Sequence, residues 1–204
     1  MAPGATQLSR LQRLAETIHI MGLGIWIGAL LLAATAAAII FPTVKALDPE
    51  LYTFAKYTGE HWRITAGIPA QKIFFSADIV QLICAALACA GMIVLIVTRA
   101  VEPWNHRVTS GMIRSIPLTI VMMLFGVHLF FISPSMSSNW VQFLAHAKAG
   151  EMELATPFQE KFASMHPVST KILGSLLVAL LITLLAALND VTRRTTQPSN
   201  QHST

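Results

Sequence analysis

Four polar side chains stand in or beside long apolar stretches of this sequence and could together bind a ligand: Asp78, Gln81, His128 and His166. Ionisable residues are costly in an apolar environment and usually face the interior of a helix bundle. Asp78 and Gln81 lie near the start of one apolar segment, His128 lies in the later part of the next, and His166 lies just before the last. The sequence therefore predicts that the four side chains converge at one level of a bundle.

The chemistry expected of this cluster depends on whether it holds a metal. Two imidazoles, a carboxylate and the nearby thioethers of Met136 and Met165 would suit a soft or borderline metal such as copper. The alternative is a hydrogen-bonded cluster that fixes the register of the helices, and the lack of a short zinc-type ligand spacing favours it. The sequence requires no cofactor, and the two candidate cofactors are copper and haem.

A further histidine, His19, lies inside the first apolar segment, at the opposite end of the predicted bundle. About nine to fifteen residues of helix, roughly 15–20 Å, separate its depth from that of His128, so this pair would not hold a haem between them. Buried polar groups normally find a hydrogen-bond partner. We therefore expect His19 to bond a neighbouring carbonyl or Glu16, and a ligand of its own is the alternative.

Four long apolar segments must position these side chains. Hydrophobic residues make up 54% of the chain and charged residues 12%, about half the ~25% charged share that is usual in soluble domains. Segments 18–41, 73–98, 113–133 and 168–188 each reach the ~20 residues with which a helix crosses a bilayer. None alternates polar and apolar residues as a strand does. The sequence predicts an all-α integral membrane protein with a four-transmembrane-helix bundle.

The chain is expected to form one transmembrane domain, residues 16–190, between two tails. Residues 1–15 are the N-terminal tail, and residues 191–204 are a C-terminal tail that we expect to be disordered. Pro42 and Pro134 are expected to end the first and third spans, because proline interrupts helical hydrogen bonding.

Each of the two long loops is predicted to hold a short amphipathic helix on the membrane surface. Asp48, which a proline follows, is a typical helix start. Asn139 would start the second helix, with Trp140 and Phe143 as membrane anchors and Gly150 at its end. The alternative is that these helices are extensions of the spans.

Small and polar residues at helical spacing form three stripes, which we interpret as the inward seams of the bundle. Small side chains let helix backbones approach closely in lipid. The stripes are Gly24 and Gly28 in the first span; Asp78, Gln81, Ala85 and Ala88 in the second; and Ser175, Ala179, Thr183 and Ala187 in the fourth. The Gly24-x-x-x-Gly28 pair could instead be a dimerisation face.

Four crossings would place both termini on one side of the membrane. The 14 Lys and Arg residues divide equally between the two sides, but the arginines on the terminal side, Arg114 among them, lie in short segments near span ends. That placement favours cytoplasmic termini, in the bacterial inner membrane. The expected partners are the lipid bilayer and either a second copy of the chain or a larger membrane complex. The mild, scattered net charge of +4 argues against nucleic acid.

Several short motifs resemble one known family. IHIMGLGIWIGALLL in the first span, FP after it, SPSM at the end of the third span and FASMHPVSTKILGSLL before the fourth resemble the transmembrane protein 205-like family, whose domain is catalogued as domain of unknown function 4149. The resemblance covers most of residues 14–190 but is weaker in the second span, so it implies no role for Asp78. It implies a four-helix integral membrane protein whose molecular activity is not established. The residues that match the family pattern are His19, Trp26, Gly28, Pro134, Phe162, His166 and Ser169.

No catalytic motif stands in the sequence, which has no nucleophile elbow, nucleotide-binding loop, HExxH or dinucleotide fingerprint. We therefore expect a protein that is not an enzyme: a non-catalytic membrane bundle or a subunit of a membrane assembly. A copper- or haem-handling protein is one alternative. A small-solute transporter is another, although four short helices give little room for alternating access unless several chains assemble.

Overall fold

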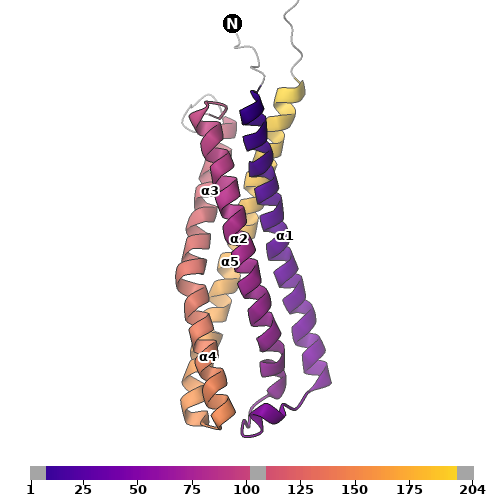
Figure 1. The fold of residues 1–204 in the computed structure, drawn as a ribbon, viewed down its shortest axis with the longest axis vertical. Coiled ribbons are helices and arrows are strands. Elements are labelled where there is room, and N and C mark those ends of the chain that lie inside the picture. Colours follow the sequence, from indigo (N-terminus) through magenta and orange to yellow (C-terminus); the bar gives the residue numbers. More distant parts are fainter. Residues whose placement is uncertain (1–7, 102–108, 197–204) are drawn as a thin grey trace, which may run out of the picture. The chain divides into compact units, whose positions relative to one another are not determined.

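The computed structural model describes residues 8–101 and 109–196, and within these ranges the chain is helical and contains no strand (Figure 1). The elements in order are α1 (Arg10–Leu47), the 3₁₀ turn η1 (Tyr52–Phe54), α2 (His61–Val97), α3 (Thr109–Val127), the π-helical turn η2 (His128–Ile132), α4 (Ser133–Ala149) and α5 (Met152–Thr196).

Four helical runs are long and apolar enough to cross a membrane, as the sequence predicts. They are Arg10–Leu47, His61–Val97, Met112–Ala149 and Met152–Arg193. The third run joins α3, η2 and α4 without a break. The prediction of an all-helical chain with four long apolar helices is confirmed.

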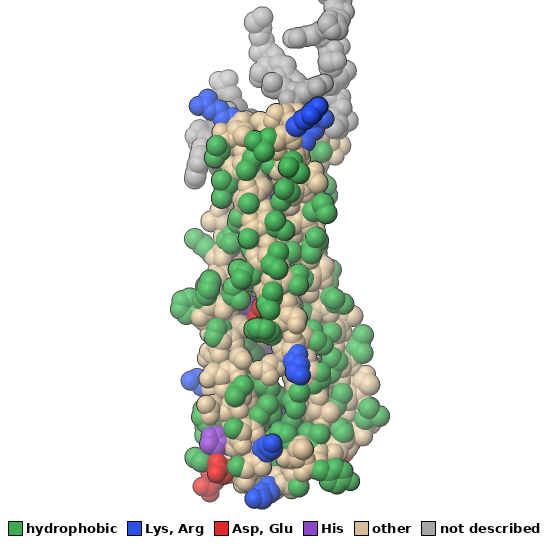
Figure 2. All heavy atoms as spheres, in the orientation of Figure 1, with side chains coloured by type: hydrophobic (Ala, Val, Ile, Leu, Met, Phe, Trp, Pro, Cys, Tyr) green, Lys and Arg blue, Asp and Glu red, His purple; other side chains and the backbone are tan. Residues whose placement is uncertain are grey.

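Every one of these helices exposes large hydrophobic side chains. Leu32 in α1 is 71% exposed, Phe75 in α2 and Met123 in α3 are each 67% exposed, and Leu185 in α5 is 64% exposed. On the face drawn in Figure 2, hydrophobic side chains are spread over the surface and charged ones are sparse. Soluble monomers rarely expose large apolar patches, so this surface is suited to an apolar surrounding.

The expectation that Pro42 and Pro134 end helices is wrong. Pro42 lies inside α1, which continues to Leu47, and Pro134 lies in the first turn of α4. Apolar surroundings tolerate proline in a helix when local 3₁₀ or π adjustments satisfy the freed backbone groups. Such an adjustment immediately precedes Pro134. In a regular α-helix the ring of Pro134 would clash with the carbonyl of Phe130. Phe130 lies in the π-helical turn η2, where the α-helical pattern is interrupted.

The two predicted loop helices are not present as separate elements. Asp48 has a positive φ of 42°, and only the short 3₁₀ turn η1 forms before α2 begins at His61. The second predicted helix is the end of the third long run, so the alternative of an extended span describes it better. Asn139 is internal to α4, where its Nδ2 donates to the Ser135 carbonyl at 2.7 Å. Gly150 ends this helix at φ 84°, in the left-handed region that favours glycine.

The helices also extend into both predicted tails. Helix α1 begins at Arg10, and α5 continues to Thr196. Residues 10–15 and 191–196 are therefore helical, while residues 1–7 and 197–204 lie outside the described residues.

The chain divides into two compact units, and each of the four long helical runs contributes to both. Unit 1 comprises residues 8–27, 82–101, 109–122 and 177–196. Unit 2 comprises residues 28–81 and 123–176. Each unit has its own buried core.

The core of unit 1 contains apolar side chains from all four runs. Trp26, Leu95, Val121 and Leu180 are completely buried there. The α2 stripe predicted from the sequence continues into this core, with Ala85 2% exposed and Ala88 fully buried. Most of the α5 stripe is also buried: Ala179, Thr183 and Ala187 are inside, whereas Ser175 is exposed.

The glycines that pack helices α1 and α2 together are not the predicted pair. Gly24 and Gly28 are exposed, and a Cβ added at either would meet no atom within 4 Å, so they form no inward seam. A Cβ at Gly91 would instead lie 2.7 Å from the Ala15 carbonyl oxygen. One at Gly22 would lie 3.1 Å from the Ala88 nitrogen. The close backbone approach therefore occurs at Gly22 and Gly91.

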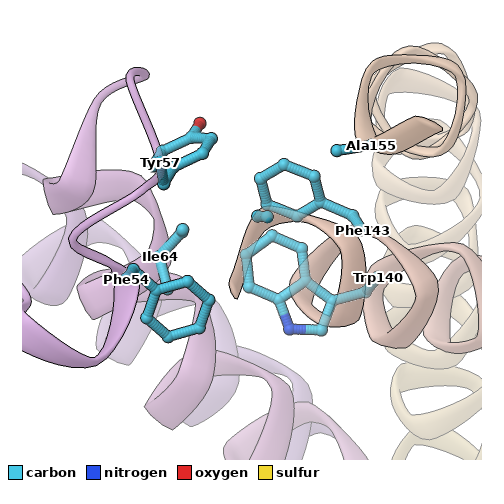
Figure 3. Close-up of a cluster of buried hydrophobic side chains, with 7 residues drawn as sticks. Phe54, Tyr57, Ile64, Trp140, Phe143 and Ala155 are labelled. Atoms are coloured by element: carbon cyan, nitrogen blue, oxygen red, sulfur yellow. The ribbon is translucent and has the colours of Figure 1, made fainter. Parts of the chain in front are cut away.

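The core of unit 2 is aromatic (Figure 3). Trp140 and Phe143 of α4 pack with their ring centroids 5.4 Å apart, and Tyr57 meets Phe143 edge to face at 5.8 Å. A Cβ at Gly67 would lie 2.4 Å from the Trp140 ring, so glycine provides the space for the indole. The two residues predicted as membrane anchors, Trp140 and Phe143, are in fact core residues. The buried members of this cluster are Phe54, Tyr57, Ile64, Trp140, Phe143, Ala147 and Ala155.

Candidate functional site

Unit 1 contains a buried ionic cluster centred on Arg114. Its guanidinium donates to both oxygens of Glu16, at 2.7 and 3.3 Å, and to Asp190 at 3.2 Å. Arg114 is fully buried, and Glu16 and Asp190 are 4% and 7% exposed. The fork of two donors onto one carboxylate is the strongest geometry that arginine offers. The cluster therefore ties together α1, α3 and α5 within unit 1.

His19 links the same unit to α2. Its Nδ1 lies 2.8 Å from the Ala88 carbonyl oxygen, and the side chain is fully buried. A carbonyl oxygen only accepts hydrogen bonds, so Nδ1 carries the proton. This is the carbonyl bond that the sequence analysis expects for His19. Together with Arg114, it connects all four helical runs of unit 1 by polar contacts.

The cluster of Arg114, Glu16 and Asp190 is not predicted from the sequence. In the sequence Arg114 reads as a loop charge near a span end, and Glu16 as a partner for His19. Arginine and glutamate lie 98 positions apart in the sequence, so their contact depends on tertiary packing. One signal was available: Asp190 lies three residues after Ala187, on the same face of α5.

Unit 2 contains a second buried polar group, centred on Asp78. Ser133 Oγ donates to Asp78 Oδ2 at 2.8 Å, and Gln81 Nε2 donates to Oδ1 at 3.3 Å. His128 Nε2 lies 3.6 Å from Oδ1, within ion-pair distance but beyond a normal hydrogen bond. All three residues are buried: Asp78 is 8% exposed, Gln81 is 2% exposed and His128 is 6% exposed. Three of the four residues predicted to converge therefore meet, with Ser133 as an unpredicted fourth member.

The π-helical turn explains how His128 and Ser133 reach the same carboxylate. The Ser133 N–H donates to the His128 carbonyl, a bond that spans five residues. In an α-helix, two residues five apart would point about 140° away from each other, at roughly 100° per residue. The wider π turn brings them onto one face instead. Both side chains can then face Asp78 on α2.

His166 lies apart from this group. It is exposed, and its ring stacks on Phe162 at a centroid distance of 6.2 Å. The thioether of Met165 accepts a hydrogen bond from Ser135 Oγ at 3.4 Å. Within residues 8–101 and 109–196, no three His, Cys, Asp or Glu side chains come close enough to hold a metal ion. The structure therefore does not support a copper site built on Asp78, His128 and His166.

The residues that match the family pattern occupy different environments. His19 and Trp26 are fully buried, and Ser169 is 8% exposed. Gly28 and His166 are exposed. These residues therefore mark helix positions rather than one site. Of the rest, Pro134 lies in the first turn of α4, and the Phe162 ring packs 5.4 Å from Trp140.

A third polar group orders the segment between α1 and α2. The Leu51 N–H donates to Nδ1 of His61 at 2.9 Å, and Nε2 of His61 donates to the Tyr57 carbonyl at 2.9 Å. Burial is the main cause that raises the pKa of the Tyr57 phenol above its ordinary value of 10.0, while Arg63 opposes the shift. His61 thus serves as a structural link at the start of α2.

Two buried polar groups in separate units, one ionic and one built around an Asp–His pair, are the features that a function must account for. The chain was compared with protein-family models, with curated proteins and with solved structures, and none of the three comparisons finds a match.

Proposed function

We propose that this chain is an integral membrane protein of the transmembrane protein 205-like type, which crosses the bilayer four times and acts as a non-catalytic bundle or as a subunit of a membrane assembly. The observation that carries the proposal is the exposure of large hydrophobic side chains along all four helical runs, for example Leu32, Phe75, Met123 and Leu185. In water these side chains would be exposed at a cost of about 25 cal/mol per Å². In lipid the same side chains can stay on the surface without this cost.

The interior polar groups support the same proposal. Arg114 is matched by Glu16 and Asp190, and the carboxylate of Asp78 accepts hydrogen bonds from Ser133 and Gln81. Ionisable residues in membrane helices face the bundle interior and pair with one another. A chain with apolar outer faces and paired inner charges has the polarity pattern that a bilayer requires.

The proposed topology places both termini on the same, cytoplasmic side. Support comes from unit 1, where the Arg114 cluster joins Glu16, near the start of α1, to Asp190, near the end of α5. The two ends of the described chain therefore emerge together (Figure 1). The buried position of Arg114 removes it from the flanking charges that favour a cytoplasmic side, so the charge argument rests on the remaining arginines.

The proposal is tested by placing an arginine at two equally exposed positions of α1. Leu32, in the middle of the helix, is 71% exposed, and Leu47, at its end, is 73% exposed. In a bilayer, Leu32→Arg should reduce membrane insertion at a cost of about 2.5–3.5 kcal/mol, whereas Leu47→Arg should be tolerated near the interface. The measurement is the fraction of each variant that resists alkaline carbonate extraction. Equal, unimpaired insertion of both variants would contradict a spanning α1.

The subunit part of the proposal is tested by native mass. A chain of 22.2 kDa that belongs to an assembly should run in mild detergent as a larger particle, either a multiple of its own mass or a complex with other subunits. A strictly monomeric protein, both in native membranes after cross-linking and in mild detergent, would contradict the assembly and leave a stand-alone bundle.

A small-solute transporter formed by several copies is the second candidate. The observation that favours it is the presence of buried ionisable groups in both units, because such residues often mark ion or proton pathways. Uptake of a solute into vesicles by purified protein, lost in a folded Asp78→Asn variant, would favour this candidate over the first.

A further inference from the structure

The carboxylate of Asp78 lacks a permanent counter-charge among its contacts. The two groups that donate to it, the Ser133 hydroxyl and the Gln81 amide, are neutral. A buried carboxylate that is stabilised only by neutral donors retains a large desolvation cost. Among the described residues, His128 is the one basic side chain recorded within ion-pair distance of Asp78, at 3.6 Å. The net charge of this group therefore depends on the protonation of His128.

The two ring nitrogens of His128 have different surroundings. Nε2 faces the carboxylate of Asp78. Nδ1 is buried and has no hydrogen-bond partner among the described residues. Because a carboxylate only accepts, the Nε2 proton is the one that Asp78 favours, and this leaves the lone pair of Nδ1 available. Nδ1 is thus the atom at which the ring can take up a second proton.

The backbone holds this pair at a structural cost. A π-helical turn interrupts the regular α-helical hydrogen bonds, and such turns occur frequently at functional sites. Here the turn begins at His128 and its hydrogen bond ends at Ser133, the two residues of this run that contact Asp78. A regular helix through residues 128–133 would turn one of them away. The irregular turn therefore selects this arrangement.

The other titratable side chains of unit 2 have different partners or are exposed. Lys45 of α1 lies over the Trp62 ring, and His146 of α4 pairs with Glu151. On α2, Lys72 is exposed, and His61 is bonded to Leu51 and Tyr57. On the part of α5 that belongs to unit 2, the exposed basic residues are Lys161, His166 and Lys171. None of these forms an ion pair with Asp78 or His128.

We propose that Asp78 and His128 form a reversible proton-binding site, in which Nδ1 of His128 takes up one proton and Asp78 supplies the counter-charge. The proton comes from an aqueous hydronium ion, which leaves as water, and one N–H bond forms at Nδ1; release reverses the step. The loaded pair is neutral, and its charge-assisted contact is stronger than that of the unloaded pair. Ser133 and Gln81 are positioning residues that hold the carboxylate in both states.

The test is ¹⁵N NMR of histidine-labelled full-length protein in detergent or nanodiscs, which reports the protonation of each ring nitrogen. As the pH of the sample is lowered from about 8 to about 5, His128 should change from a form protonated at Nε2 alone to a form protonated at both nitrogens. In Asp78→Asn the second protonation should be lost over the same range. A His128 that remains neutral, or remains fully protonated, over this range in the unmodified protein would overturn the proposal.

Two variants provide controls. His128→Gln assigns the signal, because its resonances must disappear from the spectrum. Ser133→Ala removes one donor to Asp78 without changing any charge, so His128 should still take up its proton. Protonation of His128 that is unchanged in a folded Asp78→Asn would also overturn the proposal. The experiment is independent of the assembly proposed above, since a protein that is not a subunit can still bind this proton.

Discussion

The two units of this chain are built from the same four helical runs but are stabilised by different interactions. In unit 1, Arg114 joins three helical runs through buried carboxylates, and the bond from His19 to the Ala88 carbonyl attaches the fourth. In unit 2, the rings of Tyr57, Trp140 and Phe143 form the core. Unit 2 also contains the buried Asp78–His128 pair, which lies outside this aromatic cluster.

The two units also differ in the kind of buried basic group that faces their carboxylates. In unit 1 the guanidinium, which stays charged at any ordinary pH, is held by a bidentate contact. In unit 2 the basic group is an imidazole, whose charge can change near neutral pH. A charge that cannot change fixes helices in place, whereas one that can change couples the site to its surroundings. We therefore expect mutations in the two units to have distinct consequences.

The largest effect is expected for Arg114→Met. It leaves Glu16 and Asp190 without their shared buried cation, and breaking a buried ion pair typically costs about 3–5 kcal/mol. Hydrogen exchange should rise in residues 109–122 and 177–190, and less in residues 133–149 of unit 2. An Arg114→Met protein with unchanged unfolding temperature in detergent and unchanged exchange would contradict a structural role for the cluster. Adding Glu16→Gln and Asp190→Asn should recover part of the loss, because the uncompensated charges are then gone.

The next effect is expected for Phe143→Ala, which empties the centre of the aromatic core of unit 2. Phe143 is 1% exposed, and truncation of a buried phenylalanine costs about 3 kcal/mol or more. Phe131→Ala is the matched control, because this ring is 70% exposed. The measurement is thermal unfolding in detergent with hydrogen exchange by segment. Equal destabilisation by both variants would mean that the ring cluster is not the core of unit 2.

Smaller effects on stability, opposite in sign, are expected from alanine substitutions at two glycines. Gly91→Ala would place a methyl group 2.7 Å from the Ala15 carbonyl oxygen and should cost about 1–3 kcal/mol through overpacking. Gly174→Ala would meet no atom within 4 Å, and the better helix propensity of alanine should stabilise the protein by up to about 1 kcal/mol. Comparing the unfolding temperatures of both variants checks the close approach of α1 and α2 in unit 1.

The smallest effect concerns alkaline pH and Tyr57. Burial raises the pKa of its phenol, so as pH rises through about 10 the unfolded chain ionises first. The folded state, which favours the neutral phenol, then loses stability. Tyr57→Phe cannot ionise and should lose less stability above about pH 10 than the unmodified protein. If the stability of the two proteins falls in parallel as pH rises, burial of this phenol does not contribute to the loss of stability at alkaline pH.

Much of the fold could be predicted because the length of an apolar segment is a local property of the sequence. The four long helices and the buried α2 stripe through Asp78 and Ala88 follow from composition and helical period. The choice between Gly22 and Gly24 does not follow from the sequence. These residues differ by about 200° on the helix, but both are glycines in an apolar run, and only the neighbouring helix decides which one is buried.

The sites could be predicted only in part for a similar reason. Asp78, Gln81 and His128 stand out because they are polar residues within apolar runs, whereas Arg114 lies close enough to a span end to be read as a loop charge. The π-helical turn that brings Ser133 to Asp78 has no clear signal except the proline that follows it. Tertiary contacts between residues 98 positions apart, such as that of Glu16 with Arg114, cannot be read from spacing.

The membrane topology is tested most directly by labelling single cysteines in intact cells. In a background of Cys84→Ala and Cys89→Ala, one cysteine is placed in turn at the exposed residues Ser9, Glu50, Glu151 and Thr192. Four crossings predict that a membrane-impermeant reagent labels Glu50→Cys and Glu151→Cys from outside, while Ser9→Cys and Thr192→Cys react only after permeabilisation. Labelling of Ser9→Cys and Thr192→Cys from opposite faces would contradict the four-span account.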